Sequence, residues 1–115
     1  MRLKKGDIYL ANLNPQKGNE IGKLRPILVF QTNLLNEAGH LTTIILPLST
    51  YLIDDSYPLR FRIKKRDNLE KDSDIVIDQI RAIDNKSILP KLLTKLTPKE
   101  INLVNEQLKI VLDII

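Results

Sequence analysis

Gly22-Lys23-Leu24-Arg25-Pro26-Ile27-Leu28-Val29-Phe30-Gln31 is the stretch of sequence from which the fold can be worked out. Its second half, Ile27 to Phe30, is an unbroken run of branched and aromatic side chains, which predicts a strand buried on both faces. Pro26 has no N–H to give to a strand ladder, so we expect it to be the first residue of that strand. The residue before a proline is pushed out of the helical region, so Arg25 should be extended.

Arg25 therefore has a rigid backbone, comes directly before a buried strand, and follows a loop that contains glycine. One interpretation is a surface arginine that pairs with a carboxylate. The other is a cation that holds a phosphate through its bidentate fork of N–H groups. The fixed backbone and the glycine-containing loop favour the phosphate site.

Further strands are expected from short apolar or alternating segments separated by polar turns. They are predicted at 6–13, 41–48, 58–64 and 74–83, the last bent near Asp78, with a short further segment at 88–96. The turns and loops between them are predicted at 14–15, 16–23, 32–40, 49–57, 65–72 and 85–87. This order of strands is typical of a mostly-β protein.

The C-terminal segment is predicted to be a helix that begins at Pro98. Thr97, Pro98 and Glu100 form a capping box with proline at the first helical position. One apolar stripe of this helix comprises Ile101, Val104, Leu108, Val111, Leu112 and Ile115. A second stripe, set apart by Glu100 and Gln107, comprises Leu103, Ile110 and Ile114. The second stripe predicts contact with another subunit; the alternative is a helix sunk deeper into a small core.

Several short strands followed by one helix predict a mostly-β barrel with a covering helix. The 115 residues contain no internal repeat, low-complexity tract or linker, so we expect a single domain over residues 1–115. No signal peptide follows the basic N-terminus, and no apolar run approaches the roughly 20 residues of a membrane helix. We therefore expect a cytoplasmic protein.

Composition excludes several kinds of chemistry. The chain has no cysteine, so it forms no disulfide or thiolate metal site. Its one histidine, His40, lies in a polar turn, so neither a His pair nor a Ser-His-Asp triad is available. We expect no metal and no cofactor. The formal charge of +4 favours a polyanionic partner.

Polar groups stand at the ends of the strands around Arg25. Glu20 lies in the loop before it, Ser49 and Thr50 end the strand at 41–48, and Asp78 interrupts an apolar run. Asp78 either pairs with a cation such as Arg81 or transfers a proton. A set of Arg, Ser/Thr and carboxylates without His or Cys suits phosphoryl transfer driven by positioning and charge.

RNA supplies its own nucleophile for such a reaction, because its 2′-hydroxyl can attack the adjacent phosphate without a metal. The protein then needs a base near the 2′-oxygen and a cation at the developing negative charge. Arg25 suits the role of cation. An arginine stays protonated, so it is poorly suited to donate a proton.

The chain resembles the MazF/PemK (Kid-like) toxins of type II toxin–antitoxin systems. The resemblance covers nearly the whole chain and rests on the order and spacing of several segments. These are Gly6-Asp7-Ile8-Tyr9, Asn14-Pro15 with Gly18-Asn19-Glu20, Arg25-Pro26-Ile27-Leu28-Val29, Pro47-Leu48-Ser49-Thr50, 78–84 and the C-terminal helix. It implies an SH3-like β-barrel, a homodimer, and metal-independent, sequence-specific cleavage of single-stranded RNA, which inhibits translation and growth. The implied RNA is mRNA, with rRNA or tRNA as the alternatives. A further implication is neutralisation by an antitoxin with a flexible acidic tail.

The resemblance also implies roles for single residues. By position, Arg25 matches the active-site arginine, Ser49 the Ser/Thr, Glu20 the acidic loop residue and Asp78 the carboxylate that some members use as a base. The residues implied to bind RNA are Asn19, Lys23, Thr50, Gln79 and Arg81. The chain departs from the common pattern at Ile21 and Lys23, where glutamine and glycine are frequent, and at Val76, where some members have arginine. Arg25 is then the main catalytic cation, and the base is Glu20 or Asp78.

Two other functions fit the same kind of fold. One is a CcdB-like toxin that binds DNA gyrase, which needs no cluster of Arg, Ser/Thr and carboxylate. The other is a non-catalytic RNA-binding module, which should display exposed aromatic side chains at strand centres. Only five phenylalanine and tyrosine residues are present, so the sequence favours the ribonuclease.

Overall fold

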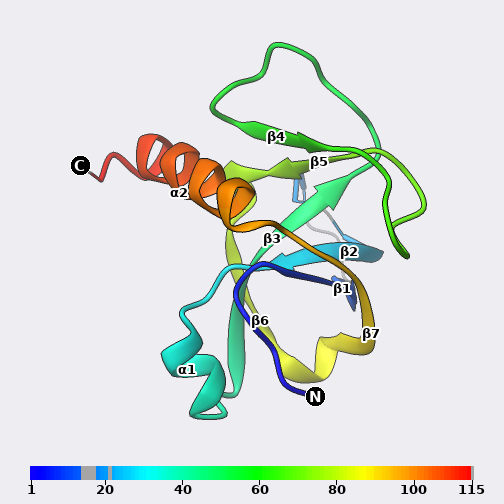
Figure 1. The fold of residues 1–115 in the computed structure, drawn as a ribbon, viewed down its shortest axis with the longest axis vertical. Coiled ribbons are helices and arrows are strands. Elements are labelled where there is room, and N and C mark those ends of the chain that lie inside the picture. Colours follow the sequence, from blue (N-terminus) through cyan, green and yellow to red (C-terminus); the bar gives the residue numbers. More distant parts are fainter. Residues whose placement is uncertain (14–17, 21, 115) are drawn as a thin grey trace.

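The structure, a computed structural model, describes residues 1–13, 18–20 and 22–114 (Figure 1). Within these residues the strands are β1 (Asp7–Asn12), β2 (Leu24–Val29), β3 (Thr42–Ser49), β4 (Arg60–Ile63), β5 (Ser73–Val76), β6 (Arg81–Asp84) and β7 (Ile88–Lys95). The helices are α1 (Asn33–Glu37) and α2 (Pro98–Leu112), and the 3-10 turns are η1 (Ile77–Gln79) and η2 (Asn85–Ser87). The expected turn at 14–15, part of the expected loop at 16–23, and Ile115 lie outside the described residues.

The strands form one antiparallel sheet in the order β4-β5-β3-β2-β1-β7, with β6 also paired to β3. Along the described strands the pairing does not close on itself. The turn between β4 and β5 nevertheless reaches β7, since the backbone N–H of Asn68 donates to the carbonyl of Leu93 at 2.9 Å. The expected class, mostly β with a C-terminal helix, is confirmed, and the barrel is open between β4 and β7.

Two apolar cores lie on the two faces of the central strands. One contains Leu28, Leu46 and Ile75, and α2 packs onto it through Val104. The other contains Ile27, Val29 and Ile45 and lies on the opposite face. Because side chains alternate along a strand, the run from Ile27 to Phe30 supplies both cores, and the predicted burial on both faces is confirmed.

Helix α2 begins as predicted. The Thr97 hydroxyl accepts a hydrogen bond from the Glu100 N–H, and the Glu100 carboxylate accepts one from the Thr97 N–H. The helix lies along β4 and β5 at one end of the molecule, while α1 lies at the other end (Figure 1). No helix in the described part of the chain is long and apolar enough to cross a membrane.

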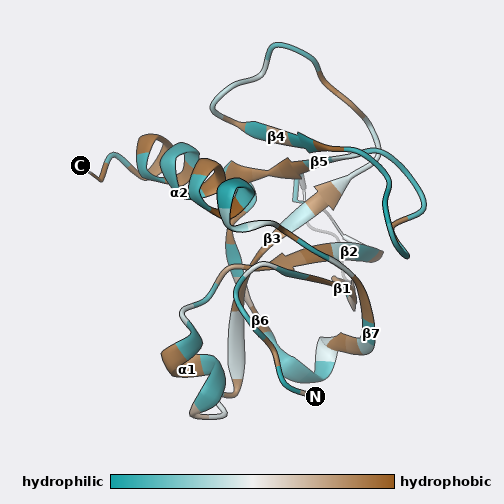
Figure 2. Cartoon of the chain, in the orientation of Figure 1, coloured by the Kyte–Doolittle hydropathy of each residue, from teal (hydrophilic) through white to brown (hydrophobic). Residues whose placement is uncertain are grey.

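The two predicted stripes of α2 differ in burial. The first packs on the core through Val104, Ile101, Leu108 and Val111, although Leu112 is exposed. The second stripe, Leu103, Ile110 and Ile114, is exposed. Figure 2 shows hydrophobic and hydrophilic segments alternating around this helix. The contact of the second stripe with another subunit stays a prediction. The alternative, a helix sunk deeper into a small core, is wrong for these three residues.

Gln107, which lies between the two stripes, is buried although it is polar. Its amide donates hydrogen bonds to the carbonyls of Pro58 and Arg60, both at 2.9 Å. These carbonyls lie at and just before the start of edge strand β4. The polar side chain is buried because it satisfies backbone groups that the sheet leaves without a partner.

Two local predictions are corrected. Strand β2 begins at Leu24, so Pro26 is its third residue. β2 pairs with β1 from Leu24 to Leu28 but with β3 only from Ile27, so Pro26 lies where β2 has a neighbour on one side. Within the segment expected to be a turn at 32–40, Thr32 accepts a hydrogen bond from the Leu34 N–H and starts the short helix α1.

Candidate active site

A row of polar side chains crosses three strands on one face of the sheet. Antiparallel pairing sets Ser49 of β3 opposite Asp74 of β5, and Asp74 opposite Arg62 of β4. The pairing of β2 with β3 ends at Ile27 and Pro47, so Arg25, near the start of β2, and Ser49, at the end of β3, each lie two residues beyond it, at the same end of the two antiparallel strands. Directly paired residues share a face, and neighbouring strands lie about 4.8 Å apart. The order Ser49, Asp74, Arg62 thus follows from the register.

Arg25 is half-buried at the start of β2. Its Nε donates a hydrogen bond of 2.8 Å to the Gly22 carbonyl, which anchors the guanidinium to the loop before the strand. Among the residues that the structure describes, no carboxylate forms an ion pair with Arg25. The first of the two interpretations of this arginine, a structural ion pair, therefore has no support in these residues.

Ser49 is the last residue of β3, and its side chain is nearly buried. Its Oγ accepts a hydrogen bond of 3.1 Å from the N–H of Tyr51. A hydroxyl that accepts in this way still has its own proton to donate. Ser49 can therefore donate a hydrogen bond to an oxygen atom placed near its hydroxyl.

Asp78 lies in the irregular part of the segment that pairs with β3, between β5 and β6. β3 advances three residues from Leu48 to Ile45, while the facing segment advances six from Ile75 to Arg81. The 3-10 turn η1 takes up the excess, and the expected bend is confirmed. Asp78 is exposed there, and within the described residues it has no ion pair, so the expected alternative of pairing with Arg81 is wrong.

The loop before β2 is tied to this bulge by two contacts. The Gln79 amide donates to the carbonyl of Asn19 at 3.3 Å. Nη1 of Arg81 lies 4.0 Å from Oε2 of Glu20, at the limit of an ion pair. The structure therefore brings four of the predicted site residues, Asn19, Glu20, Gln79 and Arg81, to one corner of the sheet.

Lys23 and Thr50 complete the predicted set. Lys23 is exposed with a positive φ of 67°, and its carbonyl accepts from the N–H of Leu13, which closes the neck of the loop. Thr50 is exposed and lines a hollow of about 250 Å³ with Pro26 and Lys91. Pro26 faces away from Arg25 along the strand, so Thr50 borders the opposite face of β2 from the arginine.

Sequence reasoning missed Asp74, which is 1% exposed. Burial acts to raise the pKa of its carboxyl, but hydrogen bonds from Arg62, the Ile53 N–H and Arg60 outweigh that effect and hold the pKa below its ordinary value. The alternating Arg60 and Arg62 could have signalled a buried counter-charge, but the identity of the partner depends on strand register.

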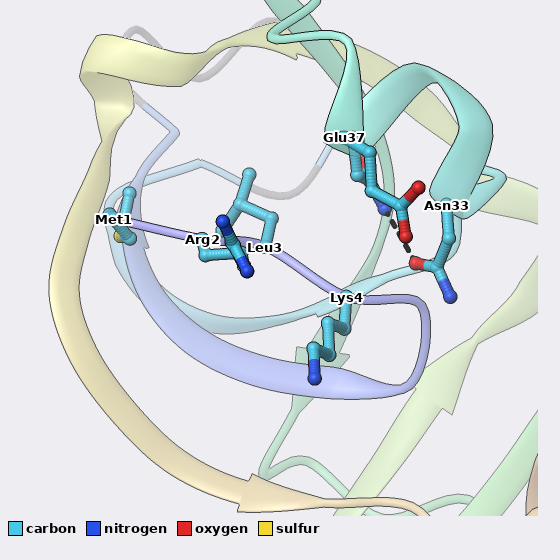
Figure 3. Close-up of a pocket in the computed structure, with 7 residues that line it drawn as sticks. Met1, Arg2, Leu3, Lys4, Asn33 and Glu37 are labelled. Atoms are coloured by element: carbon cyan, nitrogen blue, oxygen red, sulfur yellow. Dashed lines mark hydrogen bonds between the residues drawn. The ribbon is translucent and has the colours of Figure 1, made fainter.

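A hollow of about 660 Å³ lies between residues 1–4 and α1 (Figure 3), and none of the residues of the row lines it. The hollow is near the end of β2, where the N–H of Gly6 donates a hydrogen bond to the carbonyl of Val29. Arg25 lies four residues before Val29, roughly 13 Å away along the strand. Within the described residues, no group of three or more His, Cys, Asp or Glu could hold a metal ion.

Comparison with known proteins identifies the family of the chain. Residues 4–112 match the family described as PemK-like, MazF-like toxin of type II toxin–antitoxin system. The chain is 35% identical to Endoribonuclease EndoA of Bacillus subtilis (strain 168) over 116 aligned positions, covering 100% of this chain and 98% of the relative.

Two solved structures share the fold. One is MazF (Form-I) from Deinococcus radiodurans, with a TM-score of 0.80, 20% identity and coverage of 98% of both chains. The other is an endoribonuclease in complex with its cognate antitoxin from Mycobacterial species, with a TM-score of 0.73, 18% identity and coverage of 99% of this chain and 96% of that one. With a family match over most of its length and a full-length relative, the chain belongs to the PemK-like, MazF-like toxins of type II toxin–antitoxin systems.

Proposed function

We propose that this protein is the toxin of a type II toxin–antitoxin system and a metal-independent, sequence-specific endoribonuclease. Its substrate is single-stranded RNA, namely mRNA with rRNA or tRNA as the alternatives, and cleavage inhibits translation and growth. What supports the proposal is that Arg25, near the start of β2, and Ser49, at the end of β3, lie at the same end of two neighbouring antiparallel strands, in a chain of this toxin family. It acts in the cytoplasm as a single toxin domain over residues 1–115.

The chemistry is an attack of the RNA 2′-oxygen on the adjacent phosphorus. The new O2′–P bond forms as the P–O5′ bond breaks, the 2′-proton goes to a base, and the leaving 5′-oxygen takes a proton. Arg25 and Ser49 hold the non-bridging oxygens and stabilise the charge that develops on them. The products are a 2′,3′-cyclic phosphate, or the 3′-phosphate to which it opens, and a 5′-hydroxyl.

Two carboxylates are available to take the 2′-proton. Glu20 and Asp78 are both exposed, and the contact between Gln79 and Asn19 holds their segments together. A comparison of Glu20→Gln with Asp78→Asn identifies the base, since removal of the base lowers the rate by about 10²–10⁴-fold and loss of a binding contact raises KM.

RNA contacts extend to Asn19, Lys23, Gln79 and Arg81 at the corner of the sheet and to Thr50 directly after β3. The cognate antitoxin has an acidic flexible tail that competes with RNA for this basic surface. The exposed stripe of α2, Leu103, Ile110 and Ile114, is the contact of a two-fold dimer. A net charge of +4 per chain doubles in such a dimer and suits a long anionic ligand.

The test is incubation of purified protein with a long single-stranded RNA in excess chelator, followed by mapping of the ends. We expect cuts at a defined motif with cyclic or 3′-phosphate ends and no loss of rate in chelator. Arg25→Ala should lose about 10²-fold or more in rate while its circular dichroism stays that of the wild type. Substrates with 2′-deoxyribose at the cut should resist.

Three results would contradict the proposal. Efficient cutting of the deoxy substrate would remove the 2′-hydroxyl from the mechanism. Binding of RNA without cleavage would favour the non-catalytic module. Growth arrest together with gyrase binding and intact RNA would favour the CcdB-like function.

A further inference from the structure

The buried carboxylate of Asp74 is the centre of a hydrogen-bond network beside Ser49. Its Oδ2 accepts from the N–H of Ile53 at 2.9 Å and from Nη1 of Arg60 at 3.2 Å. Its Oδ1 accepts from Nε of Arg62 at 2.9 Å. Ile53 lies in the loop that follows β3, whereas the two arginines lie on β4 (Figure 1). Asp74 therefore joins the loop after Ser49 to the neighbouring strands.

A second set of contacts links this network to the hydroxyl of Ser49. Nη1 of Arg60, which binds Asp74, also donates to the carbonyl of Tyr51 at 2.9 Å. The N–H of Tyr51 donates to Oγ of Ser49 at 3.1 Å. Both polar groups of the Tyr51 backbone are thus held, the carbonyl by an arginine that Asp74 orients and the N–H by the serine hydroxyl.

The direction of these bonds determines what Ser49 can do. A serine side chain otherwise chooses among three staggered rotamers. The Tyr51 N–H selects the rotamer in which Oγ accepts, and the hydroxyl proton is then left to point elsewhere. A buried carboxylate with two arginines is a demanding arrangement, since an uncompensated charge is strongly disfavoured inside a protein. Loss of one partner is therefore costly, and the hydrogen bonds from Arg60 and to Ser49 hold the backbone of Tyr51 in place.

We propose that Asp74 is a positioning residue for RNA cleavage: through Arg60 and the backbone of Tyr51 it holds the Ser49 hydroxyl as a donor to the reacting phosphate. This inference rests on the proposed ribonuclease function. Asp74 does not touch RNA or the reacting atoms. Its loss allows the loop after β3 to move, and Ser49 then no longer donates in the required geometry.

A purely structural role for Asp74 predicts something different. If the carboxylate only stabilised β4 and β5, its removal would lower the melting temperature and leave the turnover of folded protein unchanged. If it acts through Ser49, its removal should lower kcat only while the serine hydroxyl is present. A double-mutant cycle separates these two cases.

The experiment measures kcat and KM on a short RNA oligonucleotide that spans a cut mapped with the wild-type protein. Single-turnover conditions keep the slow variants measurable. We expect Ser49→Ala to lose about 10²-fold in kcat, and Asp74→Asn about tenfold, with KM changed less than about threefold. In the Ser49→Ala background, Asp74→Asn should change kcat less than about twofold.

Glu100→Gln is the matched control. Glu100 is also a carboxylate held by an arginine and a backbone N–H, since it accepts from Arg66 at 2.8 and 2.9 Å and from Thr97 at 2.8 Å. It lies at the start of α2 and outside the network around Ser49. Its substitution should lower stability and leave kcat within about twofold of the wild type.

Arg60→Met provides a second route if Asp74→Asn does not fold. Methionine keeps an unbranched stem on half-buried β4 and removes both donors, to Asp74 and to Tyr51. The same cycle with Ser49→Ala applies. A kcat that is unchanged by the substitution, or that falls by the same factor with and without the serine hydroxyl, would overturn the inference. A wild-type protein that does not cleave RNA would instead contradict the proposed function.

Discussion

Replacement of Gln107 by methionine tests how α2 is attached to the sheet. Its amide donates to the carbonyls of Pro58 and Arg60, each at 2.9 Å, and the side chain is 4% exposed. Methionine has nearly the same length and no donor, so packing is largely kept while both carbonyls lose their partner. A net hydrogen bond contributes about 0.5–1.5 kcal/mol, and an unsatisfied buried group costs about 1–3 kcal/mol.

The expected loss is therefore about 2–3 kcal/mol in the free energy of unfolding, after some gain from burying a more apolar side chain. For a chain of this size that corresponds to a melting temperature lower by roughly 10 °C. The assay is urea unfolding followed by circular dichroism, at one protein concentration, because association would shift the apparent stability.

Asn102→Met is the control on the same helix. Asn102 is exposed, so its substitution should change stability by less than about 0.5 kcal/mol. If Gln107→Met loses no more than this control, the two carbonyls are satisfied without the glutamine. The account of a buried polar side chain that joins helix to strand would then be refuted.

Other substitutions and conditions test the remaining parts. The pKa of Asp74 is lowered in the folded state, so the ionised carboxylate stabilises the fold above the unfolded pKa of about 3.9, and this stability is lost as pH falls through the folded pKa. The difference in melting temperature between wild type and Asp74→Asn should therefore be large at pH 7 and shrink towards pH 3. Ile110→Glu places a charge on the exposed stripe of α2 and should lower the sedimenting mass from twice to once that of the monomer, whereas a wild-type monomer that cleaves RNA at full rate would contradict the dimer. Arg25→Lys should recover little of the activity lost in Arg25→Ala, because a point charge does not replace a bidentate fork; near wild-type cleavage by the lysine variant would count against phosphate binding by two N–H groups.

Local signals in the sequence were sufficient for the elements that depend on neighbours along the chain. The capping box at Thr97 fixes where α2 begins, because it satisfies N–H groups within one turn. The apolar run from Ile27 to Phe30 predicted a strand buried on both faces, because successive apolar side chains point to opposite faces and both faces must then be covered. The bend near Asp78 was also readable, since a carboxylate interrupts that apolar segment.

The short helix α1 and the start of β2 were mispredicted because other signals competed with proline and turn residues. Thr32 supplies a cap that starts α1, and β1 extends its pairing with β2 back to Leu24. Proline is tolerated inside β2 because a second neighbour begins only at Ile27. These outcomes depend on which strands meet, and periodicity in a single segment does not contain that information.

Burial of polar side chains was decided by tertiary structure alone. Gln107 reads as a polar residue between two stripes, yet it is buried because two carbonyls nearly fifty residues away along the chain need a donor. Asp74 reads as the first residue of a strand, yet register places it between Ser49 and Arg62. The sequence determined which residue types could build a phosphate site. Strand register determined which of them meet, because antiparallel pairing joins residues far apart in the chain at spacings of about 5 Å.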